Sequence, residues 1–166
     1  MGNFISVYAA DPGRMNQLRG STDAHSAILA AHPETDRDGL ARLFAGAYTT
    51  DGESDDAGPV LYAFQMLCET FAPSGATVEI YLDEDHFPTA WNFVCGAEDP
   101  PFPLPVSSSG TPSVAYLPTS ELPNQLDSWQ ETAAAESPYA AESGEIAAVL
   151  QYALRHNLGV YLFVTE

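Results

Sequence analysis

The sequence predicts an α+β fold, a single domain spanning residues 1–166 in which helices pack on a small mixed β-sheet. Strand-like apolar runs stand near both ends of the chain and at residues 77–82, and apolar residues at helical spacing separate them. The length of 166 residues suits one ordinary domain. A hydrophobic content of 45% predicts a folded core despite the net charge of −18.

The first quarter of the chain predicts a strand followed by short helices. Residues 4–9, FISVYA, are β-prone, and Asp11 with Pro12 suits the first turn of a helix. Two more helical patterns follow up to residue 44, and the run Ser21-Thr22-Asp23 offers an N-terminal cap for the first of them.

Residues 59–72, PVLYAFQMLCETFA, predict the central core helix. Pro59 suits a first helical position, and Pro73 ends the segment. Apolar residues recur at helical spacing and form a broad stripe: Val60, Phe64, Leu67 and Phe71. Most of this helix should therefore be buried. The acidic, glycine-containing stretch before it, residues 48–58, predicts an exposed loop.

The middle of the chain predicts one half-covered strand and a long covering segment. Residues 77–82 alternate apolar and polar side chains, and the aromatic stretch at 87–94 either packs back on the sheet or lines a groove. Prolines interrupt residues 97–123, which should form a proline-rich loop laid over the domain, with residues 114–117 as a brief edge strand.

The C-terminal part predicts a final helix and a central strand. Residues 122–135 are either helical or flexible. Ser143 is the expected N-cap of an amphipathic helix that ends near Arg155. Residues 160–164, VYLFV, are apolar throughout, so this strand needs both faces covered and should lie inside the sheet.

The charge distribution is the strongest functional signal. The chain has five arginines and no lysine, and between Leu43 and Leu154 it has seventeen Asp and Glu residues with no cationic side chain. Such a region creates a negative potential that attracts basic partners and repels phosphates. The sequence therefore predicts a basic protein partner and no direct nucleic-acid binding.

Cysteine usage and hydropathy predict a cytoplasmic protein that does not bind membranes. Cys68 and Cys95 form no metal-binding spacing, and both are expected to be buried thiols. The N-terminus lacks the pattern of a signal peptide, and no apolar run reaches membrane-spanning length.

Several packing features together resemble a known protein family. They are the N-terminal strand running into a helix, the core helix around Tyr62 to Glu69, the segment PSVAYL at 112–117, and the C-terminal helix followed by an apolar strand. In these features the chain resembles small bacterial proteins known only as domains of unknown function and, more distantly, the YfbM-like proteins. The resemblance implies a fold and carries over no catalytic residue, because no activity is established for that family.

No sequence motif predicts a catalytic residue or a cofactor. The chain lacks a G-x-S-x-G elbow, a P-loop, a dinucleotide fingerprint and an H-E-x-x-H helix. The run DEDH at 83–86 offers ligands suited to Mn, Fe or Zn, provided that distant residues such as His25 or His32 converge on it. A metal-dependent enzyme or sensor at this turn is the alternative hypothesis.

The leading hypothesis is a non-enzymatic, acidic binding module, such as an immunity or inhibitor protein that covers a basic toxin or effector. A competing interpretation is that the acidity serves only solubility or adaptation to a salty cytoplasm. The candidate contact residues are carboxylates in two stretches and one nearby aromatic residue: Asp51, Glu53, Asp55, Asp56, Asp83, Glu84, Asp85 and Trp91.

Overall fold

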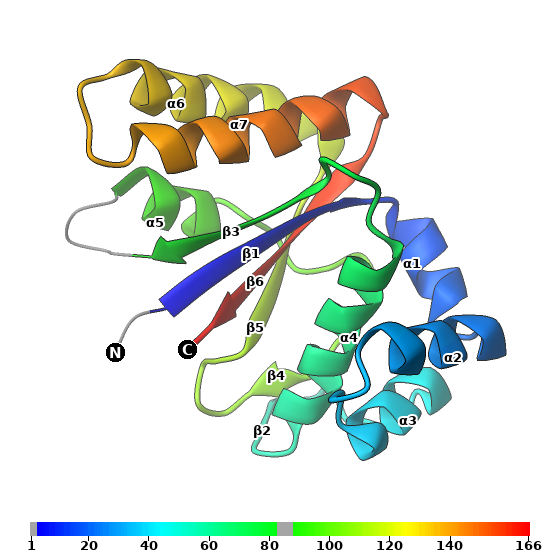
Figure 1. Cartoon of the computed structure of the whole chain (residues 1–166). Coiled ribbons are helices and arrows are strands. Elements are labelled where there is room, and N and C mark those ends of the chain that lie inside the picture. The colour runs from blue at the N-terminus through cyan, green and yellow to red at the C-terminus, as the bar shows by residue number, and fades with distance from the viewer. Residues whose placement is uncertain (1–2, 83–87) are drawn as a thin grey trace.

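A four-stranded antiparallel sheet forms the centre of the protein (Figure 1). The computed structural model describes residues 3–82 and 88–166. The strand order is β3 (Thr77–Leu82), β1 (Asn3–Ala10), β6 (Gly159–Thr165) and β5 (Ser113–Leu117). Parallel pairing occurs in a separate two-stranded piece, in which β2 (Glu53–Ser54) pairs with β4 (Val106–Ser107). The predicted α+β class is confirmed.

Helices cover both faces of the sheet, as Figure 1 shows. One face carries α6 (Leu122–Ala134) and α7 (Ala140–Arg155), with α5 (Pro88–Cys95) beside them, and the other carries α4 (Ala57–Phe71). The remaining helices pack around α4: α1 (Pro12–Leu18), α2 (Thr22–Ala31) and α3 (Arg37–Ala45). A short 3₁₀ helix, η1 (Thr119–Glu121), precedes α6.

Strand side chains alternate between two apolar cores because successive residues of a strand point to opposite faces. On β1, Ile5 and Val7 join the core under α7, whereas Tyr8 joins the core under α4. Residues 159–164 of β6 are all buried, and β6 lies between β1 and β5. The prediction that this apolar strand is central is therefore confirmed.

The predicted core helix is confirmed as α4, which begins two residues earlier than Pro59. Its stripe of apolar residues faces the sheet, and the buried Phe64 ring contacts three other rings: Phe102 at 5.4 Å, Tyr161 at 5.2 Å and Phe163 at 5.7 Å between centroids. The contacts with Phe102 and Tyr161 are edge-on, and ring contacts of this kind add to the free energy gained from burial.

The proline-rich segment packs against the domain, as the sequence predicted for a segment that covers it. Phe102 is buried, and the Arg19 guanidinium lies 4.9 Å from the centre of its ring. Arg19 also donates a hydrogen bond of 2.8 Å to the Tyr48 hydroxyl, which in turn donates to the Pro103 carbonyl at 3.2 Å. The predicted edge strand is β5, at the end of the sheet.

Three local predictions need comment or correction. Ser143 is not an N-cap: α7 begins three residues earlier, and Ser143 is buried within its first turn. Cys68 is buried as expected, but Cys95, at the end of α5, is exposed. The aromatic stretch forms α5, and its Phe93 ring packs edge-on against Trp129 of α6 at 5.3 Å.

None of the helices in the described ranges has the length and apolar character needed to cross a bilayer.

Candidate functional site

The acidic loop between α3 and α4 is fixed against the proline-rich segment. Glu53 of β2 pairs with Val106 of β4, and the Ser108 hydroxyl donates a hydrogen bond to the Asp55 carboxylate. The side chains of Asp51, Glu53, Asp55 and Asp56 are all exposed. The structure therefore gathers these four predicted contact residues on one surface beside β4.

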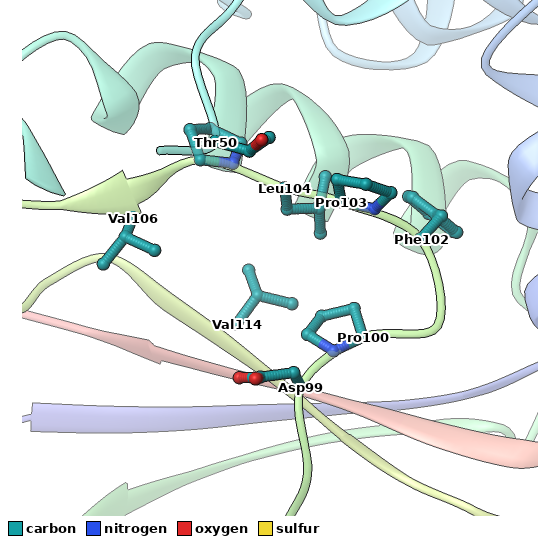
Figure 2. A pocket seen from close by; sticks show the side chains of 9 residues that line it. Thr50, Asp99, Pro100, Phe102, Pro103, Leu104, Val106 and Val114 are labelled. Atoms are coloured by element: carbon teal, nitrogen blue, oxygen red, sulfur yellow. The ribbon is translucent and has the colours of Figure 1, made fainter. Parts of the chain in front are cut away.

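A hollow of about 320 Å³ lies next to this acidic loop (Figure 2). In Figure 2, the Val114 side chain points into the space between Asp99 and Leu104. Val106, which is 50% exposed, links this hollow to the loop through β4. Most of the lining residues have apolar side chains, and the walls are formed by Thr50, Asp99, Pro100, Phe102, Pro103, Leu104, Pro105, Val106 and Val114.

The hollow combines apolar side chains with polar groups. The Asp99 carboxylate and the Thr50 hydroxyl are its polar side-chain groups, and both residues are exposed. Such a surface fits a side chain with an apolar stem and a cationic end, because the stem contacts proline and valine while the charge reaches a carboxylate. Sequence reasoning missed this hollow, although the apolar residues among the prolines indicated which part of the cover faces the domain.

The carboxylates of the acidic loop have no ion-pair partner within the described residues. In the described residues, ion pairs join Arg42 to Asp38 at 3.9 Å and His32 to Glu34 at 3.5 Å, both outside the loop. Arg42 also reaches the end of the loop, where it donates to the main-chain carbonyl of Asp56 at 3.3 Å. The Arg42 guanidinium therefore binds a neutral main-chain group there and forms no ion pair with a loop carboxylate.

A second polar cluster lies where α4 meets β1 and β3, and sequence reasoning missed it. The Gln65 amide donates to the Ser6 hydroxyl at 3.2 Å and to the Tyr8 hydroxyl at 3.3 Å. Ser6 donates to Glu79 at 2.9 Å, and Tyr8 donates to Glu69 at 3.4 Å. Burial is the main reason that the pKa of Tyr8 lies well above its usual value, and the nearby Glu69 raises it further.

This second cluster borders a hollow of about 230 Å³, lined by Tyr8, Glu69, Thr77, Val78 and Glu79. A sequence signal for it existed: Ser6 and Tyr8 are polar groups at alternate positions of an apolar strand, and Gln65 interrupts an apolar helix. Buried polar groups need hydrogen-bond partners, so such interruptions indicate a network.

The other predicted site residues are not tested by the structure. Asp83, Glu84 and Asp85, together with His86, lie outside the described residues, and Trp91 is on α5 but its side chain is not described. Within residues 3–82 and 88–166, no group of three or more His, Cys, Asp or Glu residues could hold a metal ion. His25 packs edge-on against the Phe44 ring at 5.1 Å.

Comparison with known proteins identifies a family of unknown function. No curated protein and no solved structure matches the chain. The model of DUF7691, a domain of unknown function, matches residues 1–165. Because the match extends over nearly the whole chain, the protein belongs to the DUF7691 family.

Proposed function

We propose that the protein is a non-enzymatic binding module that docks onto a basic protein through the acidic loop at 51–56 and the hollow beside it. The observation that carries this proposal is the lack of ion pairing: in the described part of the chain, Asp38 is the carboxylate paired with an arginine. Asp51, Glu53 and Asp55 are exposed and unpaired there. A partner that supplies cations is the natural complement of this surface.

The physical role of the loop is to accelerate encounter and to orient the partner. Exposed like charges produce a potential that raises the association rate of an oppositely charged protein, and salt screens this effect. Affinity then depends on groups that become buried. Val106 and the wall around Val114 supply apolar area for that purpose.

The finer parts of the proposal follow from charge and resemblance. The partner is a basic toxin or effector that the protein covers as an immunity or inhibitor protein in the cytoplasm, and no nucleic acid or membrane is bound. Asp83, Glu84, Asp85 and Trp91 are the remaining proposed contact residues. We also propose that the protein is bacterial and is distantly related to the YfbM-like proteins.

Co-expression with the products of neighbouring genes, followed by calorimetric titration at several salt concentrations, tests the proposal. The test variant is Asp51→Asn/Glu53→Gln/Asp55→Asn, which removes three loop charges and keeps acceptor atoms. The matched control, Glu131→Gln/Glu136→Gln/Glu145→Gln, removes three exposed charges from the α6 and α7 region. We expect the loop variant to bind about tenfold more weakly and the control to change affinity by less than about twofold.

Three results would contradict the proposal. The first is that no basic neighbouring product binds. The second is that the affinity is the same at low and high salt. The third is that both triple variants weaken binding equally. In that case total charge alone matters, and the acidity serves solubility or adaptation to salt.

A further inference from the structure

Part of the sheet on the α4 side carries exposed aromatic and acidic side chains next to the strand edge. We call this surface the β3 face and define it by residues of β1, β3 and α4: Phe4, Ser6, Tyr8, Tyr62, Gln65, Glu69, Thr77, Glu79 and Tyr81. Phe4 lies opposite Tyr81, Ser6 opposite Glu79 and Tyr8 opposite Thr77. The strand order places β3 at an end of the sheet.

The aromatic end of the β3 face is unusually exposed. Phe4 is 39% exposed and Tyr81 52%, and their rings meet edge-on at 5.6 Å. Tyr62, 43% exposed, lies three residues before Gln65 on α4, a spacing that makes the two neighbours on the helix surface. Of the large hydrophobic side chains that are exposed in the described residues, Phe4 and Tyr81 are in ring contact, Tyr62 is on the helix that packs on β1, and Val106 is on β4. Grouped exposed rings mark surfaces that bind partners.

The acidic end of the β3 face holds two carboxylates in fixed positions. Ser6 donates to Glu79, Tyr8 donates to Glu69, and the amide of Gln65 donates to both hydroxyls. Gln65 is only 7% exposed, so the packing around α4 sets this geometry. Neither carboxylate has an ion-pair partner in the described part of the chain. Two negative charges therefore border the 230 Å³ hollow without a cation.

We propose that the β3 face docks an extended, arginine-containing segment of a protein partner, with one guanidinium group in the hollow between Glu69 and Glu79. A guanidinium fork matches carboxylate geometry better than an ammonium group does. A neighbouring arginine stacks on Phe4 and Tyr81, whose ring faces attract cations. Because β3 is the last strand in the sheet order, an extended segment can lie alongside it.

This inference rests on the proposed function in one respect, that the partner is basic, but it uses a different surface. The acidic loop at 51–56 attracts and orients the partner, whereas the β3 face binds one of the partner's arginine side chains. The two surfaces are separate in the fold, because β2 lies beyond the opposite end of α4 from Glu69. Figure 1 shows β2 near the start of α4 and β3 near its end. Each surface can therefore be altered alone.

The test is an NMR titration of the ¹⁵N-labelled protein with two probe peptides, tetra-arginine and tetra-lysine. We expect saturable shifts in the amide signals of β1, β3 and the second half of α4, with tetra-arginine binding at least about threefold more tightly than tetra-lysine. Glu69→Gln/Glu79→Gln should weaken tetra-arginine binding by about tenfold. Phe4→Ala/Tyr81→Ala should weaken it by about threefold to tenfold.

The loop triple variant and the α6 and α7 triple variant are the controls in the same titration. Both should change tetra-arginine affinity by less than about twofold. Shifts centred on residues 50–56, or an equal loss in all the charge variants, would overturn the β3-face inference and leave loop docking standing. Conversely, a tetra-arginine site at β3 in a protein whose loop variant binds its partner normally would contradict the proposed function alone.

Discussion

At the residue scale, two buried tyrosines show how hydrogen-bond partners determine what a buried hydroxyl group contributes to stability. The Tyr8 hydroxyl accepts a hydrogen bond from the Gln65 amide and donates one to Glu69. The Tyr161 hydroxyl is buried and has no hydrogen-bond partner among the described residues. Burial is the main cause that raises the pKa of both phenols above the ordinary value. A satisfied and an unsatisfied hydroxyl thus occur in the same core.

Replacing these tyrosines by phenylalanine should have opposite effects on the free energy of unfolding at neutral pH. Tyr8→Phe should lower it by about 1 kcal/mol or more, because Gln65 loses a partner, whereas Tyr161→Phe should leave it unchanged or raise it by up to about 1 kcal/mol. Urea denaturation measures both values. Equal destabilisation by the two variants would show that the Tyr161 hydroxyl has a partner.

The same phenols predict a loss of stability in alkali. The folded-state pKa of each phenol lies above the unfolded value of about 10. The stability that the protonated phenols contribute is therefore fully present below about pH 10, and it is lost as the pH rises above that value. Urea denaturation of the wild type and Tyr161→Phe from about pH 8 to about pH 11 should show a smaller decline in the variant. An identical decline would contradict this assignment.

At the element scale, the contact between α3 and α4 depends on one glycine. A Cβ added at Gly39 would lie 2.6 Å from the Pro59 carbonyl carbon and would also overlap the Pro59 carbonyl oxygen. These are main-chain atoms of α4, so the helices would have to move apart. The sequence predicted both helices, but it gave no sign that their backbones approach so closely.

Alanine substitution at two helical glycines should separate packing from helix propensity. Gly39→Ala should lower the free energy of unfolding by about 1–3 kcal/mol through overpacking. Gly144→Ala in α7, where no atom beyond the adjacent residues and the helix's own backbone lies within 4 Å of the added Cβ, should raise it by about 0.5–1 kcal/mol. Thermal and urea denaturation give both values. A neutral Gly39→Ala variant would show that α3 shifts at little cost.

At the scale of the whole molecule, the net charge of −18 should make stability depend on salt. Repulsion among unpaired carboxylates opposes the compact state, and screening over about 10 Å at 0.1 M salt reduces it. We therefore expect Tm, measured by calorimetry, to rise by several degrees between about 20 mM and about 500 mM NaCl. The α6 and α7 triple variant, with three fewer charges, should show a smaller rise. A Tm that stays constant or falls would mean that the charges are spaced too widely to repel.

The sequence by itself determined the fold class, the central β6, the core α4 and the unbalanced negative charge. These features are local or additive: apolar periodicity reports which side of an element is buried, and charge is a sum over residues. A boundary set by packing was harder to predict, as at α7, where Ser143 is buried inside the helix and does not cap it.

Only the tertiary structure decided which residues meet. It placed Glu53 beside Val106 and brought Glu69 and Glu79 to one hollow through the buried Gln65, although these residues come from separate elements. Contacts of this kind depend on strand order and on the direction in which α4 crosses the sheet, and neither leaves a periodic signal in the chain. The acidic composition predicted a basic partner, and the packing of α4 against β1 placed the two carboxylates at which we propose that an arginine binds.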